Sequence, residues 1–209
     1  DNKIILSPIK VAIVDSGIIP ATDLIKNKLI SSYNLTENLD MNNWSSHATY
    51  IASVFSGIIK KKSKQNIYAE NANLNSIKIS FADDVGDSEV KNYGSMQLAA
   101  ALDVAVSSGA KVVNLSLSYN EEPDQNVEMA EKIVISNAAK SGVFFVVAAG
   151  NEGKDLGLFP AYPASYNLNN MISVASHSSN LSLATTSNFG NLVELSALGS
   201  QVELNNRFS

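Results

Sequence analysis

Three polar residues of this chain carry side chains that could act together on a carbonyl group. Asp15 ends a short β-branched run, His47 opens a segment with helical spacing, and Asn151 lies just beyond a strongly apolar run. An Asp can fix the tautomer of an imidazole, and a His can take a proton from a nucleophile and return it to a leaving amine. An Asn carboxamide can donate a hydrogen bond to a tetrahedral oxyanion. Together, these side chains would support acyl transfer.

Each of these residues also has a purely structural explanation. Asp15 before Ser-Gly could make an Asx turn, and His47 could be a helix-start residue that is satisfied by water. Asn151 could be a turn residue with a positive φ. We interpret the other histidine, His177, as an exposed loop residue because it lies among serines. The choice depends on whether the fold brings Asp15, His47 and Asn151 together.

Strands and helices are expected to alternate along the chain. Short apolar runs predict strands over 10–15, 75–80, 112–117, 143–149, 171–175 and 192–197. Helical spacing predicts helices over 47–59, 95–108 and 126–140, two of which end at Gly109 and Gly142. This alternation predicts an α/β fold, a mainly parallel doubly wound sheet with helices on both faces. Functional residues of such folds lie beyond the carboxyl ends of the strands, where the three polar residues could converge.

The spacing within the helix expected over 126–140 also predicts which side chains face the core. Val127, Ala130, Ile133 and Val134 recur at helical intervals, so we expect these four to point inward.

Composition excludes several classes of protein. The chain has 209 residues, 45% hydrophobic and 17% charged, which fits one folded domain over 1–209 and not a disordered chain. The net charge of −5 offers no basic face for nucleic acid. The absence of cysteine excludes disulfides and thiol nucleophiles, and two histidines are too few for a histidine-based zinc site. No apolar run is long enough to span a membrane.

Six stretches, taken in order, resemble the subtilisin-like (subtilase, S8) serine proteases. They are Val11–Gly17 (VAIVDSG), 46–53 (SHATYIAS), 113–118 (VNLSLS), 146–153 (VVAAGNEG), 162–175 (YPAS…ISVA) and 187–199 (SNFG…LG). Together they span about residues 10 to 200, and this resemblance implies a subtilisin-like fold.

The resemblance implies a role for each candidate residue. Asp15 and His47 would be the acid and the base of an Asp-His-Ser triad, whose order along the chain they match. Asn151 would be the side-chain donor of the oxyanion hole. Ser116, Leu117 and Ser118 would offer an edge to an extended peptide substrate. Ala148, Ala149 and Gly150 would form the wall of the pocket for the side chain before the scissile bond.

The sequence departs from the family pattern in several places. Ala48, Ser118 and Leu198 replace a glycine, a glycine and a proline of the family motifs. The G-T-S-x-A motif that carries the nucleophile does not occur, although Phe208-Ser209 resembles the residues just before it. We therefore expect an incomplete peptidase domain whose serine lies on a separate C-terminal segment, and expect this chain alone to be inactive and less stable than the complete domain.

The remaining expectations also follow from the resemblance. The substrate would be a peptide or protein, an inhibitory pro-segment is a candidate partner, and the protein would be secreted. No cofactor is required, and calcium in loops is the one metal that the family suggests, although Asp83, Asp84 and Asp87 fit a solvated turn better than a ligand set. The alternatives are a non-catalytic subtilase-like binding or regulatory protein and a nucleotide-binding domain. A nucleotide-binding domain would need a G-x-G-x-x-G motif after the first strand or a P-loop, and this sequence has neither.

Overall fold

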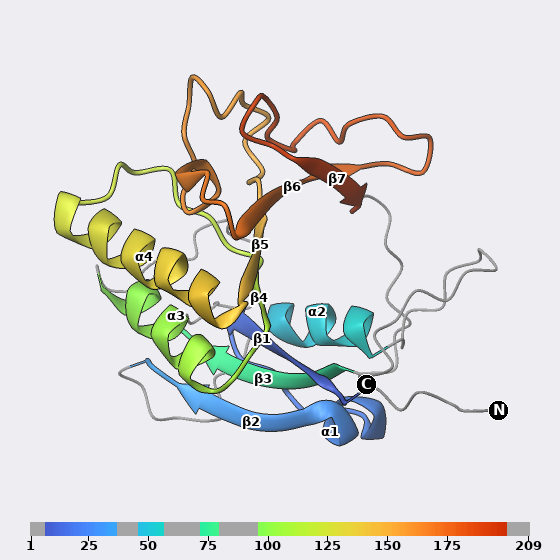
Figure 1. Ribbon diagram of the computed structural model, residues 1–209. Helices are drawn as coiled ribbons and strands as arrows, with labels where there is room; N and C mark the ends of the chain where they lie inside the picture. The colour runs from blue at the N-terminus through green and yellow to red at the C-terminus, as the bar shows by residue number, and fades with distance from the viewer. Residues whose placement is uncertain (1–6, 37–45, 57–71, 80–95, 200–209) are drawn as a thin grey trace, which may run out of the picture.

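A parallel β-sheet between two layers of helices forms the centre of the molecule (Figure 1). The computed structural model describes residues 7–36, 46–56, 72–79 and 96–199. In these ranges the strands are β1 (Ile9–Asp15), β2 (Leu29–Asn34), β3 (Ala72–Lys78), β4 (Val112–Leu115), β5 (Phe144–Ala148), β6 (Met171–His177) and β7 (Leu195–Leu198). The helices are α1 (Asp23–Lys28), α2 (His47–Phe55), α3 (Gln97–Ser107) and α4 (Gln125–Ala138), with short 3-10 turns at Ala139–Ser141 and Ala164–Tyr166.

All neighbouring strands of this sheet run parallel, in the order β2-β3-β1-β4-β5-β6-β7. Their carboxyl ends therefore form one common edge. The first strand lies in the middle, and β4 separates it from β5. The predicted α/β fold with a mainly parallel sheet is confirmed.

Helices cover the two faces of the sheet through separate apolar cores. The larger core joins α3 and α4 to one face, with Leu102, Ile135 and Phe145 among its fully buried side chains. The smaller core joins α1 and α2 to the other face, where Ala48 and Ala52 are also fully buried. Figure 1 shows α3 and α4 together on one side of the sheet and α2 on the opposite side. The two cores account for the expected double winding.

Two elements were not predicted, and the bounds of several others differ from the prediction. The helix α1 and the edge strand β2 were not expected, because 23–34 has no continuous apolar run. The strand expected over 112–117 ends at Leu115, so Ser116 and Leu117 follow it outside regular secondary structure. His177 is half-buried at the end of β6 and its Nδ1 lies 2.8 Å from the Ser178 carbonyl, so its interpretation as an exposed loop residue was wrong.

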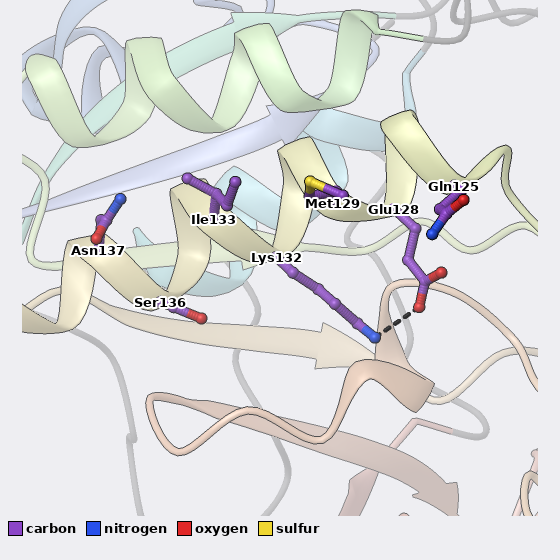
Figure 2. A pocket seen from close by; sticks show the side chains of 7 residues that line it. All are labelled: Gln125, Glu128, Met129, Lys132, Ile133, Ser136 and Asn137. Carbon is purple, nitrogen blue, oxygen red and sulfur yellow. Dashed lines mark hydrogen bonds and ion pairs between the residues drawn. The ribbon is translucent and has the colours of Figure 1, made fainter.

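The inward face of α4 was predicted only in part: Val134 packs against the larger core and Val127 and Ala130 are half-buried, but the prediction for Ile133 is wrong. Its buried residues are Glu131, Ile135 and Ala138, whereas Ile133 is 51% exposed. Ile133 and Met129 line a hollow of about 400 Å³ on this helix. Figure 2 shows these two side chains together with the Glu128–Lys132 ion pair. The hollow contains none of the candidate site residues.

Some of the predictions fall on residues outside the described ranges. The chain also has a short run of four lysines at 60–64, which predicts a solvated loop. This run, the acidic residues Asp83, Asp84 and Asp87, and Phe208-Ser209 fall outside the described ranges. Within those ranges, none of the helices has the length and apolar character to cross a bilayer.

The adjacent residues Phe144 and Phe145 test the assignment of the two sheet faces. Phe145 is fully buried under α4, whereas Phe144 points to the other face and is partly exposed. Phe145→Ala should therefore lower the free energy of unfolding by about 3–5 kcal/mol, the usual cost of a core cavity. Urea unfolding of the 209-residue chain measures this loss, with Phe144→Ala as the matched control. An equal loss for the two variants would contradict the assignment.

Candidate active site

A hydrogen-bonded Asp–His pair lies at the carboxyl edge of the sheet. Asp15 is the last residue of β1 and only 5% exposed, and His47 is the first residue of α2. The Nδ1 atom of His47 lies 2.9 Å from both carboxylate oxygens of Asp15. The backbone N–H of Ser16 donates a further bond of 2.6 Å to Oδ1. The carboxylate thus holds the Nδ1–H tautomer, which leaves the lone pair on Nε2.

The start of α2 is fastened to the turn after β1. The Ala48 backbone N–H donates to Ser16 Oγ at 3.2 Å, and the Ile19 N–H donates to Thr49 Oγ1 at 2.9 Å. Ala48 is fully buried, so the methyl group that replaces the expected glycine is accommodated in the packed helix start. These contacts explain why the imidazole reaches a carboxylate 32 residues earlier in the chain.

The environment of His47 favours its protonated form. The hydrogen bond to Asp15 raises the pKa of His47 above the ordinary value of 6.5, partial burial opposes this, and the charge of Asp15 adds to the rise. The His47 side chain is still 54% exposed. The imidazole is therefore held by a buried anion while remaining accessible from solvent.

Asn151 lies at the same edge, beyond the end of β5. Because β4 alone separates β1 from β5, the backbones of these two strands are roughly 10 Å apart. Asn151 is exposed, and its backbone N–H donates to Glu152 Oε2 at 3.0 Å. Gly150 before it has a φ of +104°, a conformation that favours glycine. The chain thus turns sharply between the strand and Asn151.

Four of the expected substrate-binding residues share a hollow with Asn151. This hollow has a volume of about 260 Å³ and is lined by Asn114, Ser116, 146–151, 174–176, Ser187, Ala197 and Gly199. Ser116, Ala148, Ala149 and Gly150 are thus brought together. Leu117 and Ser118 are half-buried but do not line the hollow, and neither do Asp15 and His47.

A buried acid supports the chain just beyond Ser118. Glu131 on α4 is 2% exposed, and its Oε2 accepts hydrogen bonds from the hydroxyls of Tyr119 at 2.9 Å and Tyr166 at 2.6 Å. Tyr119 also pairs through its backbone with Tyr162 in an antiparallel bridge. Burial raises the pKa of Glu131, against the opposing effect of the two hydroxyl donors. Glu131 was not among the residues predicted to face inward, so this cluster was missed.

Asn188, which is buried against the Asn151 loop, had no predicted role. Its carboxamide bonds to the backbone on both sides of Asn151. The stretch Ser187–Gly190 was recognised only as part of a family motif, and nothing in its spacing indicated these contacts.

The comparisons with known proteins agree with this architecture. The family model described as "Subtilase family" matches residues 7–208. The chain belongs to the subtilase family. This establishes the family that the motifs at Asp15, His47 and Asn151 had suggested.

The subtilase relatives are distant and mostly longer. Thermitase of Thermoactinomyces vulgaris is 26% identical over 92% of this chain and 63% of its own length. Subtilisin-like protease 2 of Plasmodium falciparum is 28% identical over 87% of this chain but 14% of its own length. The chain thus spans between 14% and 63% of these two curated relatives.

Solved structures show the same fold. A cold-adapted subtilisin-like serine proteinase has a TM-score of 0.70 and 23% identity, over 94% of this chain and 64% of the other. A lanthipeptide protease has a TM-score of 0.68 and 24% identity, over 91% and 55% of the two chains. The predicted subtilisin-like fold is therefore confirmed.

The Asp15–His47 contact predicts a pH-dependent effect that can be measured without activity. Asp15→Asn removes the anion that raises the pKa of His47, so this pKa should fall, as followed by NMR of the imidazole ring protons. Because the raised pKa belongs to the folded state, the pair stabilises the fold fully below pH 6.5 and loses this contribution as the pH rises through the raised value. The His177 signal is the internal reference. An unchanged His47 midpoint would show that the contact is absent in solution.

The buried acid on α4 predicts the stability of the fold at higher pH. Since the pKa of Glu131 is raised in the folded state, the contribution of Glu131 to stability is fully present below its ordinary value of 4.5 and is lost as the pH rises through the raised value. Glu131→Gln keeps an acceptor oxygen for the two tyrosine hydroxyls, which both donate to one oxygen of Glu131, but cannot ionise. Urea unfolding between mildly acidic and neutral pH should show a flatter profile for this variant. The exposed Glu121→Gln is the control, and a slope equal to that of the wild type in both variants would refute the prediction.

Proposed function

We propose that the complete protein is a serine endopeptidase in which Asp15, His47 and Asn151 form the catalytic site. The observation that carries this proposal is the 2.9 Å contact of His47 Nδ1 with the buried Asp15 carboxylate. This contact orients Nε2 as a base, as an Asp-His-Ser triad requires. Membership in the subtilase family supports the same assignment.

The proposed reaction uses each of these side chains at a defined step. His47 Nε2 accepts the proton of a serine hydroxyl while the serine oxygen bonds to the carbonyl carbon of the peptide. Asn151 donates its carboxamide N–H to the oxyanion that forms. The C–N bond then breaks, His47 gives its proton to the leaving amine, and water hydrolyses the acyl-enzyme in the same manner. Asp15 stays ionised and stabilises the imidazolium.

The nucleophile of this reaction would come from a segment that follows Ser209. The sheet offers a place for it, because α3 and α4 cover one face of β5 and β6 while the other face carries half-buried apolar residues such as Val146 and Val174. These residues line the 260 Å³ hollow beside Asn151. A segment that brings a serine to this edge could cover that face as well.

Substrate binding is proposed for the two segments that flank the hollow. Ser116, Leu117 and Ser118 directly follow β4 and would pair through their backbone with an extended peptide. Ala148, Ala149 and Gly150 would form the wall of the pocket for the side chain before the scissile bond. Ser118, which replaces a glycine of the family motif, would narrow the space for the peptide substrate.

The family suggests further features of the complete protein. Names such as "Minor extracellular protease Epr" of Bacillus subtilis, a relative that is 27% identical, support secretion. An inhibitory pro-segment and loop-bound calcium are proposed on the same ground. None of the steps above uses a metal or an organic cofactor.

The reading frame beyond Ser209 gives the first test. It should encode a G-T-S-x-A motif, and a fluorophosphonate probe should label its serine in the complete protein. A stop at Ser209, or labelling of no segment, would contradict the proposal and favour a non-catalytic relative that binds peptides.

Asn151→Ala tests the proposed oxyanion donor in the complete protein. Acylation by a peptide ester should slow by about 10²–10³-fold, the scale established for this donor in subtilisin, with little change in thermal stability because Asn151 is exposed. An unchanged acylation rate would remove Asn151 from the mechanism.

A further inference from the structure

One buried carboxamide brackets the loop that carries Asn151. Asn188 is 1% exposed and lies 37 residues after Asn151, on the segment that joins β6 to β7. Its Nδ2 donates to the Ala149 carbonyl at 2.9 Å and to Glu152 Oε2 at 2.7 Å. Its Oδ1 accepts from the backbone N–H groups of Glu152 at 3.2 Å and Lys154 at 2.9 Å.

These bonds use the full capacity of the Asn188 carboxamide. A primary amide has two N–H donors and two acceptor lone pairs, and all four are engaged here. One of the partners lies before Asn151, and the others lie after it. The backbone N–H of Asn188 also donates to the Gly150 carbonyl at 3.1 Å. These hydrogen bonds of Asn188, which we call the clamp, therefore fix both ends of a turn whose exposed tip is Asn151.

The loop is shaped to admit this clamp. A Cβ atom added to Gly150 would lie 2.4 Å from Asn188 Nδ2, so a side chain at position 150 and the carboxamide of Asn188 exclude one another. Glu152 Oε2 joins the clamp to the tip, since it accepts from both Asn188 Nδ2 and the Asn151 backbone N–H. The Asn151 side chain itself has no hydrogen bond within the described residues. Its position is therefore set through the backbone.

We propose that Asn188 is a positioning residue for the oxyanion donor, acting on the reaction through Asn151. This inference rests on the proposed peptidase function. A donor that stabilises a transition state must be aimed in advance, because an error of about 1 Å can cost on the order of 10²-fold in rate. Asn188, buried against the loop, would hold Asn151 in the required orientation.

A double-mutant cycle in the complete protein tests the proposal. Asn188→Ala should slow acylation by a peptide ester by about 10–100-fold. In the Asn151→Ala background the same substitution should change the rate by less than about threefold, because the group that it positions is already gone. An equal loss in both backgrounds, or no loss in the wild-type background, would overturn the proposal.

Asn170 provides the matched control. It is also a buried asparagine, and its Nδ2 donates to the carbonyls of Ile135 at 2.7 Å and Val143 at 3.1 Å, away from the Asn151 loop. Asn170→Ala should destabilise the fold without changing the acylation rate of the folded protein. A rate loss for Asn170→Ala equal to that of Asn188→Ala would assign both effects to general destabilisation and overturn the proposal.

Two further measurements keep the test decisive if Asn188→Ala does not fold or the protein does not acylate. Glu152→Ala removes only an exposed link of the clamp and should reproduce a smaller loss that again disappears in the Asn151→Ala background. Hydrogen exchange should quicken at least tenfold at the amides of 151–154 in either variant, and not in Asn170→Ala. Failure of the wild-type protein to acylate would refute the proposed function alone, whereas unchanged exchange at 151–154 would refute the clamp alone.

Discussion

The burial of the Asp15 carboxylate is the constraint on which the rest of the site depends. An ionised carboxylate that is removed from water is costly unless it is paired and hydrogen-bonded. Here the partners are the Ser16 N–H and the ring of His47, so the end of β1 and the start of α2 must meet. The fully buried Ala48 and Ala52 allow α2 to approach the sheet closely enough for this. Local packing and the electrostatics of the site therefore impose the same geometry.

The sequence predicted those elements whose own residues carry a strong signal. The apolar run that contains β5 is one example, and the helix ends at Gly109 and Gly142 are another, since both glycines have a positive φ. The edge strand β2 could not be predicted, because none of its residues is fully buried and its strand conformation depends on pairing with β3. The burial of Glu131 on α4 was not predicted, because a charged residue is normally exposed and the two tyrosine hydroxyls that bond to it come from elsewhere in the chain. Tertiary partners, which periodicity cannot show, decided both cases.

The residues of the candidate site also differ in how clearly the sequence indicated them. Asp15 and Asn151 were found because one ends a strand and the other lies just beyond a strand, and parallel strands bring their carboxyl ends to one edge. The order β1-β4-β5, which sets how near these ends lie, is not visible in the sequence. Asn188 had no signal of its own, since its significance lies in four hydrogen bonds to a loop that is distant in the chain. Residues that hold a site are harder to infer than residues that form it, because their role depends on what they contact.

The two faces of the sheet are covered unequally near the site. Val147 belongs to the core that includes α4 and Ala175 is also buried, whereas Val146 and Val174, their neighbours along β5 and β6, remain half-buried on the other face. Covering apolar surface contributes roughly 25 cal/mol per Å², so a segment packed on that face would stabilise the fold appreciably. In the proposed enzyme this segment also carries the serine. The completion of the core and the completion of the triad would then be a single event, which links stability to catalytic competence.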